Sequence, residues 1–260
     1  MGQNSERRVV VVTGTASGIG KAIFEEARAR GFRVAGADWD ADGLRSLQQG
    51  GHASDTLLSR VDVRDEDEVE NFAQEVVRRF GQIDVVFNNA AIFASGKISE
   101  IQAETWSKVF AVNVVGPTNI IRSFVSRMKS QSTPSTMVVT SSISSFVPTS
   151  SVGPYSASKF AILAIARTLA IELRKDAPNV TVKLLVPGAV QTDLVVNSPA
   201  ENSPRVVAAL NDAMSQRGVQ PREVAEFAFS ALDRKGFLMA MHPDVVYDQA
   251  SQSIEHLFAE

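Results

Sequence analysis

The segment RVVVVTGTASGIGKAIFEEARARG, residues 8–31, joins a short β-branched run to an amphipathic helical pattern through a turn with three glycines. Gly14, Gly18 and Gly20 let the backbone turn sharply and approach a pyrophosphate, which then lies against free N–H groups at the helix N-terminus. A tight strand-to-helix connection also uses glycine. The turn by itself therefore fits either a dinucleotide site or a plain connection.

The alternation that begins there continues along the chain. Six further apolar runs, at residues 32–38, 57–63, 83–89, 136–142, 180–187 and 237–242, are separated by longer amphipathic stretches. This pattern predicts a parallel sheet with crossover helices, and strands that are apolar throughout indicate that both faces are covered. We therefore expect a three-layer, doubly wound α/β fold.

Length and charge narrow the class of protein. The chain has 260 residues, 44% of them hydrophobic, which suits one α/β domain spanning residues 1–260. The polar segment 193–220 is expected to be a lid over a finished core. A formal net charge of -3 without a block of Lys and Arg argues against nucleic acid and anionic membranes as partners.

The residue inventory excludes several chemistries. Cysteine is absent, so disulfides, thiolate metal sites and a cysteine nucleophile are excluded, and the three histidines lack metal-ligand spacing. The N-terminus is polar and the apolar run after it is short, unlike a secretory signal. We therefore expect a cytoplasmic protein without a metal site.

Two carboxylates follow the second and third apolar runs. Asp38 stands 18 residues after Gly20, where it can accept hydrogen bonds from ribose hydroxyls and would repel the 2′-phosphate of NADP. This favours NAD, although a helix cap or turn would also explain Asp38. Asp62 is a candidate acceptor for the adenine amino group, and capping within RDEDE, residues 64–68, explains it nearly as well.

Tyr155 and Lys159 lie in GPYSASKFA, residues 153–161, of a chain with only two tyrosines. Positions i and i+4 share a helix face, so both side chains can point into one cleft. A phenol must lose about three pKa units to act as a base near neutral pH, and an ammonium about 4 to 5 Å away has an effect of that size. Taken alone, the pair would more simply be a packing tyrosine beside a solvated lysine.

Together these motifs resemble the short-chain dehydrogenase/reductase family over almost the whole chain. The family's glycine pattern matches Thr13, Gly14, Gly18, Ile19 and Gly20, and its Tyr-x-x-x-Lys matches Tyr155 and Lys159. Two positions depart from the family: Ala91 and Ser145 stand where glycine is usual. The other matches are Asn88, Asn89 and Ala90 at a strand end, Asn113 in VNVVG, Ser142 in VVTSSIS, and Pro187, Gly188 and Thr192.

The resemblance implies a Rossmann fold with a mostly parallel seven-stranded sheet in the order 3-2-1-4-5-6-7. It implies an NAD-dependent dehydrogenase acting on a secondary alcohol or ketone, assembled as a homo-oligomer, a tetramer or dimer. Tyr155 would be the general base or acid, Lys159 would lower its pKa, Ser142 would hold the substrate oxygen and Asn113 would support a proton relay. Ser141 and Ser144 remain alternatives to Ser142. The expected cofactor contacts are Gly14, Ser17, Gly18, Ile19, Gly20, Asp38, Asp62, Val63, Asn89, Ala90, Tyr155, Lys159, Pro187, Gly188, Val190 and Thr192.

Pro117 bears on the role of Asn113. Proline has no N–H, so Pro117 cannot bond the carbonyl of Asn113, and that acceptor stays open for the relay water that the family resemblance implies. A kinked core helix is the simpler alternative.

The residues expected at the cleft are nearly all apolar, which favours a hydrophobic substrate, although simple packing accounts for them equally well. They are Ile92, Phe93, Phe146, Val147, Val190, Leu194 and Val195. A non-catalytic dinucleotide sensor would not need Tyr155 and Lys159. A sugar-nucleotide epimerase or dehydratase shares that pair but usually needs a longer C-terminal domain.

Overall fold

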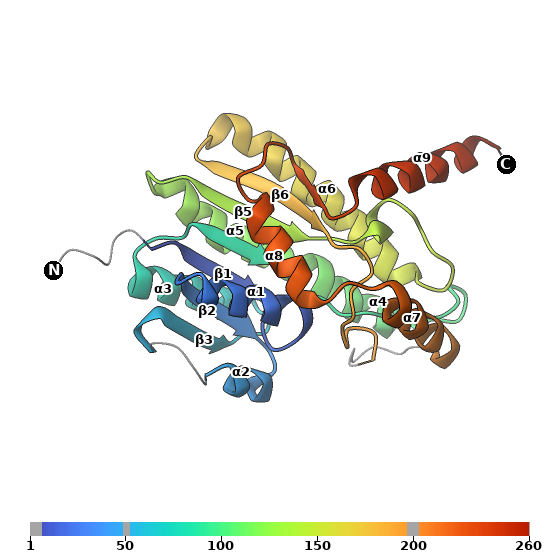
Figure 1. Cartoon of the computed structure of the whole chain (residues 1–260), viewed down its shortest axis with the longest axis horizontal. Helices are drawn as coiled ribbons and strands as arrows, with labels where there is room; N and C mark the ends of the chain where they lie inside the picture. Colours follow the sequence, from blue (N-terminus) through green and yellow to red (C-terminus); the bar gives the residue numbers. More distant parts are fainter. Residues whose placement is uncertain (1–6, 49–52, 197–202, 260) are drawn as a thin grey trace.

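The computed structural model describes residues 7–48, 53–196 and 203–259 of the chain. Within these residues, seven parallel strands form one sheet in the order β3-β2-β1-β4-β5-β6-β7, which confirms the predicted topology (Figure 1). The strands are β1 (Val9–Thr13), β2 (Arg33–Asp38), β3 (Thr56–Arg60), β4 (Val85–Asn88), β5 (Ser135–Thr140), β6 (Val180–Val186) and β7 (Leu238–Ala240).

Strand β1 lies at the centre of the sheet, and this position explains why its sequence is apolar throughout. Val9, Val10, Val11 and Val12 are all fully buried, because helices cover both faces. The strand pairs with β2 on one side and with β4 on the other. The strand order therefore reverses between β1 and β4, and their carboxyl ends border the crevice in which such folds bind ligands.

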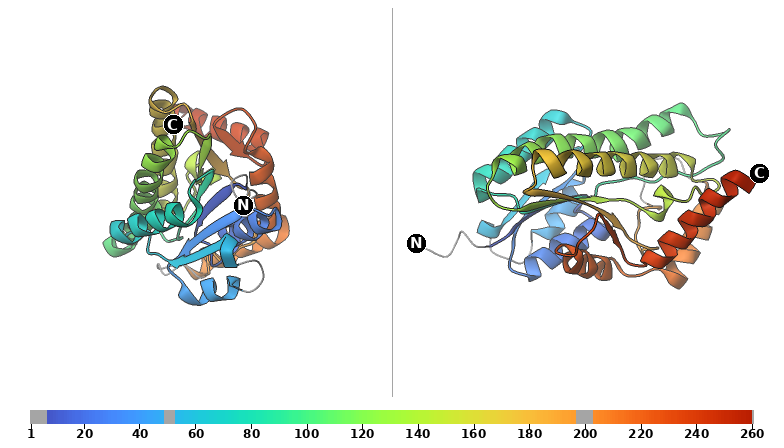
Figure 2. Two further views of the ribbon diagram at one scale, coloured as in Figure 1. Left: turned by 90° about the vertical axis from the view of Figure 1, so that its left-hand side faces the viewer. Right: turned by 90° about the horizontal axis from the view of Figure 1, so that it is seen from above.

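Two layers of helices cover the sheet, as the end-on view in Figure 2 shows. Helices α1 (Gly18–Ala29) and α8 (Pro221–Ala231) pack on one face, where Phe24 and Phe229 join the core. Helices α3 (Glu66–Phe80), α5 (Gly116–Ser130) and α6 (Gly153–Asp176) pack on the other, with Phe72, Phe124 and Ile162 buried. The short helix α2 (Ala41–Leu47) lies beside β2 and β3.

Helices α4 (Ala103–Phe110) and α5 are continuous, joined by a π-helical segment, Ala111–Val115. The kink expected at Pro117 is therefore a widened turn that comes just before the proline within one continuous helix. Proline lacks the N–H that a regular α-helical turn would use, and π-helical turns occur mostly as single turns inside α-helices. By length and composition this helix, Ala103–Ser130, is the one candidate for a membrane span among the described residues, yet half of its most apolar window is buried in the fold.

Strands β3 and β5 both end earlier than their apolar runs predict. Strand β3 ends at Arg60 and β5 at Thr140, so Asp62 and Ser142 lie in the loops beyond the strands and not at their last residues. The loop after β5 continues as a single helical turn, Ile143–Ser145. The Asp62 carboxylate and the Ser142 hydroxyl therefore both lie at the carboxyl edge of the sheet.

The last third of the chain adds two peripheral helices. Helix α7 (Pro204–Arg217) lies at the carboxyl edge of the sheet (Figure 1). Residues 197–202 of the predicted lid lie outside the described part of the chain. Helix α9 (Pro243–Ala259) extends away from the body of the molecule, and Val246 is its one buried residue (Figures 1 and 2).

Candidate active site

The glycine turn after β1 forms a concave backbone surface at the start of α1. Gly14 and Gly18 have φ angles of 73° and 54°, which side-chain-bearing residues rarely adopt. A Cβ atom at Gly20 would overlap the carbonyl oxygen of Gly14. Ser17 is the N-cap of α1 but makes no capping bond through its side chain. The first N–H groups of α1 therefore face a cradle that fits a phosphate.

The end of β4 is tied to this turn by Thr13. The Thr13 hydroxyl accepts the N–H groups of Asn89 at 3.0 Å and Ala90 at 3.1 Å, and the Asn89 amide donates to the Thr13 carbonyl at 3.1 Å. A Cβ atom at Gly14 would lie 3.0 Å from the Cα atom of Ala90. Asn89 and Ala90 therefore form one wall of the cradle, and their contact with a cofactor stays a prediction.

Asp38 supports the turn from β2. Its carboxylate accepts the N–H groups of Ala16 at 2.8 Å and Asp40 at 3.0 Å. Asp40, and not Asp38, caps α2 by accepting from Asp42. Burial raises the pKa of Asp38, and the two backbone hydrogen bonds act against that rise. Each carboxylate oxygen has one of these bonds and keeps a second lone pair for a ribose hydroxyl.

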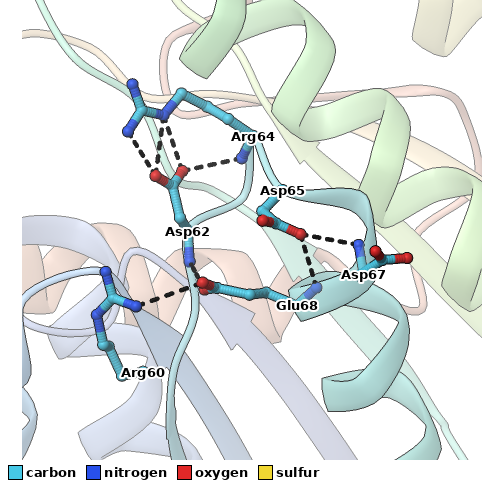
Figure 3. Close-up of polar contacts among 6 residues, drawn as sticks. All are labelled: Arg60, Asp62, Arg64, Asp65, Asp67 and Glu68. Carbon is cyan, nitrogen blue, oxygen red and sulfur yellow. Dashed lines mark hydrogen bonds and ion pairs between the residues drawn. The ribbon is translucent and has the colours of Figure 1, made fainter.

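Asp62 is engaged by a neighbouring cation, as Figure 3 shows. Arg64 holds the carboxylate in a bidentate pair, with Nη2 at 2.5 Å from Oδ2 and Nε at 2.9 Å from Oδ1. This hydrogen-bonded pair lowers the pKa of Asp62. Asp65 is the cap of α3, accepting from Asp67 and Glu68. An adenine contact at Asp62 would therefore have to share the carboxylate with Arg64.

Four further cofactor candidates come from the loop after β6. Thr192 lies against the glycine turn, since a Cβ atom at Gly18 would be 3.3 Å from its Cγ2 atom. Gly188 and Pro187 follow β6 directly at the same edge. The Val190 side chain is buried in the core between the sheet, α1 and α8, so any cofactor contact from this residue comes from its backbone.

Val63 lies between the third strand and α5. Its backbone carbonyl accepts from the Asn119 amide at 3.0 Å, and its side chain packs so closely on Gly116 that a Cβ atom there would overlap it. Val63 is buried and joins the loop after β3 to α5, and its contact with a cofactor stays a prediction.

Asn113 lies in the π-helical turn and is almost completely buried. Its side-chain oxygen accepts the N–H of Ile92 at 2.8 Å, and its amide donates to the Ile92 carbonyl at 2.9 Å and to Ser158 at 3.1 Å. The Ser158 hydroxyl in turn donates to the Tyr155 carbonyl at 2.7 Å. Asn113 therefore connects the loop after β4 to helix α6, a link that the sequence analysis did not foresee.

Tyr155, Lys159 and Ser142 come together at the carboxyl end of β5. The Lys159 ammonium lies 5.6 Å from the centre of the Tyr155 ring and donates to the Thr140 carbonyl at 3.1 Å. The Ser142 hydroxyl hydrogen-bonds the phenol of Tyr155. Ser142 also accepts the N–H of Ser144 at 3.2 Å, and Ser141 points to Ser145. Of Ser141, Ser142 and Ser144, it is Ser142 whose hydroxyl interacts with the Tyr155 phenol.

Burial dominates the pKa values of this pair. It raises the pKa of Tyr155 to about 12, and the hydrogen bond from Ser142 only partly opposes that rise. Burial also lowers the pKa of Lys159 to about 8. Both shifts have the same cause, because desolvation disfavours phenolate and ammonium alike. That Lys159 lowers the pKa of Tyr155 stays a prediction.

An apolar cluster lies directly against the Tyr155 ring. Phe93 contacts it at 5.1 Å between ring centroids, and Leu194 and Val195 belong to the same cluster, as predicted for the cleft. Ile92 packs next to Val109 and Phe146 against the main core, and their place at the cleft stays a prediction. Four members of the cluster were not predicted: Val152 and, from α7, Val207, Leu210 and Met214.

Beside this cluster, between α1 and α7, lies an open groove of about 630 Å³. Gly18 and Thr192 line it together with Lys21 and Met214. Among the described residues, no group of three His, Cys, Asp or Glu side chains is placed to hold a metal ion. The site is thus built from a phosphate cradle, a Tyr–Lys–Ser group and an apolar wall.

Comparison with known proteins agrees with this geometry. Residues 8–203 match the family model for short chain dehydrogenases. The 1-deoxy-11-beta-hydroxypentalenate dehydrogenase of Streptomyces exfoliatus is 32% identical over 243 residues, which cover 92% of this chain and 84% of that protein.

Two solved structures illustrate the likeness. A short chain dehydrogenase/reductase from Burkholderia phymatum in complex with NAD has a TM-score of 0.87 and 27% identity, covering 98% of this chain and 96% of that one. An alcohol dehydrogenase from the archaeon Thermococcus sibiricus, complexed with 5-hydroxy-NADP, has a TM-score of 0.76 and 26% identity, covering 91% and 96%. The present chain belongs to the short-chain dehydrogenase/reductase family and is an oxidoreductase with a nucleotide-binding Rossmann fold.

Proposed function

We propose that the protein interconverts a hydrophobic secondary alcohol and its ketone, with NAD as the preferred cofactor. The observation that carries this proposal is the position of the Tyr155 phenol, which is hydrogen-bonded to Ser142, adjacent to Lys159 and packed against an apolar cluster. A carbonyl or alcohol oxygen placed beside Tyr155 and Ser142 would leave the rest of its molecule among apolar side chains.

The residues divide the work of proton transfer. Tyr155 gives a proton to the ketone oxygen in reduction and takes one from the alcohol in oxidation, while Ser142 holds that oxygen. Because burial raises the pKa of Tyr155 to about 12, the phenol is protonated at neutral pH and is ready to act as the acid. In oxidation, the Lys159 ammonium opposes that rise. The bound dinucleotide would supply the hydride acceptor or donor and, when oxidised, a further positive charge.

The cofactor would lie along the crevice between the ends of β1 and β4. The turn at Gly14, Gly18 and Gly20 would hold the pyrophosphate, and Asp38 the adenosine ribose. Solved relatives bind NAD in one case and an NADP derivative in another. The preference for NAD rests on Asp38, whose carboxylate would repel a 2′-phosphate.

The substrate class rests on the apolar cluster. The cluster residues Phe93, Val152, Leu194, Val207, Leu210 and Met214 are all apolar, which favours an apolar substrate group beside Tyr155. The Streptomyces exfoliatus relative is named as the dehydrogenase of a hydroxylated pentalenate. We extend to this chain only the class, an apolar secondary alcohol or ketone.

Three broader predictions are part of the proposal. Residues 193–220 would act as the lid, because α7 places Val207, Leu210 and Met214 against the Tyr155 cluster. The protein would be a homo-oligomer, tetramer or dimer, because α6 exposes Phe160 and Ile171 on its outer side. Its expected location is the cytoplasm.

The decisive experiment follows absorbance of the reduced nicotinamide with NAD⁺ and NADP⁺ separately, against aliphatic, aromatic and steroidal secondary alcohols. Tyr155→Phe keeps the ring in the apolar cluster and removes the phenol, so turnover should fall by about 100-fold or more while dinucleotide affinity stays within about 2-fold. Full activity of Tyr155→Phe would reject Tyr155 as the acid or base. Dinucleotide binding without turnover of any alcohol or ketone would favour a non-catalytic sensor.

A further inference from the structure

Ser145 occupies a position at which the sequence motif usually has glycine, and its side chain is completely buried. Its hydroxyl contacts the hydroxyl of Ser141 and donates to the backbone carbonyl of Lys159 at 2.9 Å. A carbonyl oxygen can only accept, so the Ser145 proton is committed to Lys159. Ser141 must then donate to Ser145, and the three residues form a chain of hydrogen bonds with one direction.

This series of hydrogen bonds reaches the backbone carbonyl of Lys159 from the residues that follow β5. The end of β5 also binds the ammonium of Lys159. Thr140, the last residue of β5, accepts from Lys159 Nζ at 3.1 Å, and Ser141 follows it directly. The backbone and the side chain of Lys159 are therefore both attached to the carboxyl end of β5. Two attachments at opposite ends of a long side chain restrict its rotation far more than either one alone.

The same turn carries the proposed substrate-binding serine. Ser142 caps the segment Ile143–Ser145 by accepting the N–H of Ser144 at 3.2 Å, and its hydroxyl reaches Tyr155. Ser145 ends that segment and bonds to α6, the helix of Tyr155 and Lys159. Ser145 thus adds a second hydrogen bond, beside that of Ser142 to Tyr155, between the turn and the helix with the other two groups.

We propose that Ser145 is a positioning residue, which sets the distance between the Ser142 turn and helix α6 through a hydrogen bond that glycine cannot make. The inference rests on the proposed dehydrogenase function but not on the identity of the substrate. Catalytic groups need supporting bonds of this kind, because small displacements of a reacting group lower turnover steeply. Ser145 does not touch the substrate in this proposal.

Kinetics give the first test. Ser145→Ala should lower kcat by about 10-fold and leave the Kd of NAD within about 2-fold, since the cofactor cradle lies on other segments. Ser135→Ala is the matched control, because Ser135 is also buried on β5 but its hydroxyl has no hydrogen-bond partner within the described part of the chain. Ser135→Ala should keep the wild-type kcat.

A double-mutant cycle tests the chain itself. Ser141 acts on Lys159 only through Ser145, so Ser141→Ala combined with Ser145→Ala should cost no more than about 2-fold beyond Ser145→Ala alone. Additive losses in kcat would overturn the directed chain. Ser145→Gly is the second variant if Ser145→Ala does not fold, and the same loss is expected from it.

The NMR signal of the Tyr155 ring tests the positioning role of Ser145 without any measurement of turnover. The chain has two tyrosines, and Tyr247 is 72% exposed on α9, so Tyr247→Phe leaves Tyr155 as the sole tyrosine. With carbon-13-labelled tyrosine, the ring signal of Tyr155 should shift or broaden in Ser145→Ala and stay unchanged in Ser135→Ala. An unchanged signal together with wild-type kcat would refute the positioning role. If no alcohol or ketone is turned over by the wild type, the proposed function fails, and the ring signal alone still decides whether Ser145 positions Tyr155.

Discussion

The ring of Phe93 lies 5.1 Å from the ring of Tyr155 between centroids, tilted by 52°. Phe93 comes from the loop after β4 and Tyr155 from the start of α6, so the contact joins the two segments that border the crevice. Both rings belong to the apolar cluster that includes residues of α7. Phe93 therefore places an aromatic surface beside the proposed acid, where a substrate ring or chain would lie.

Phe93→Ala should weaken binding of large apolar substrates selectively. Losing an aromatic contact of about 2 kcal/mol corresponds to a rise in KM of about 30-fold for a bulky alcohol, with a much smaller change for a short aliphatic one. Steady-state kinetics with both alcohols measure this difference. Phe32→Ala, which removes a ring that packs on Phe229 far from the cluster, is the control and should alter neither KM. Equal losses for both alcohols would contradict the assignment of Phe93 to the substrate wall.

Lys159→Met should stabilise the fold below about pH 8 while abolishing turnover. The folded pKa of Lys159 is about 8 against an ordinary value of 10.5, so below pH 8 the native state holds a desolvated ammonium at full cost. As pH rises from 8 to 10.5, the unfolded state holds more protons than the native state, and wild-type stability from this group increases. The methionine variant should therefore have a free energy of unfolding at most about 3 kcal/mol higher than the wild type at pH 7. The lost hydrogen bond to Thr140 reduces this gain.

Denaturant unfolding at several pH values checks this prediction. The advantage of Lys159→Met over the wild type should shrink between pH 8 and 10.5. Lys175→Met, at an exposed position of α6, should show no such trend. If Lys159→Met is less stable than the wild type at pH 7, the buried ammonium stabilises the fold and the prediction is wrong.

Asp38→Ser should change the choice of cofactor. Removing the carboxylate takes away the repulsion of a 2′-phosphate and one or both bonds to the N–H groups of Ala16 and Asp40. We expect the ratio of NADP⁺ to NAD⁺ affinities to rise by about 10-fold or more, measured by calorimetric titration. Asp40→Ser keeps Asp38 and alters only the α2 cap, so its ratio should match the wild type. A wild-type protein that prefers NADP⁺ would refute the role given to Asp38.

Pro117→Ala tests whether the Asn113 carbonyl serves a proton relay. Alanine restores the N–H that proline lacks and gives the π-helical turn a donor for that carbonyl. Turnover should fall by about 5- to 10-fold, and its dependence on pH should change. This loss is smaller than the full contribution of a general acid or base, because Tyr155 itself is retained. Pro221→Ala, at the start of α8, is the matched proline control and should leave the profile unchanged. An identical profile for Pro117→Ala would reduce Pro117 to a feature of helix packing.

Local patterns predicted the fold correctly because they record how each segment is buried. Four consecutive buried valines in β1 could be read as a central strand, since only a strand covered on both faces is apolar throughout. Gly14, Gly18 and Gly20 could be placed in a turn because their backbone geometry excludes other residues. Tyr155 and Lys159 could be placed on one face because helix periodicity depends on spacing alone.

The tertiary structure decided everything that depends on contacts between distant segments. It paired Asp62 with Arg64, placed α7 against Tyr155, and gave Ser145 a hydrogen bond to Lys159 across 14 positions of sequence. It also buried Tyr155 deeply enough to raise its pKa, since desolvation depends on all the atoms around a group and not on its neighbours in sequence. The sequence by itself determined the fold and the chemical groups at the site, because burial pattern and helix spacing are local. Only the folded chain decided how those groups are oriented and charged, because that depends on packing between segments.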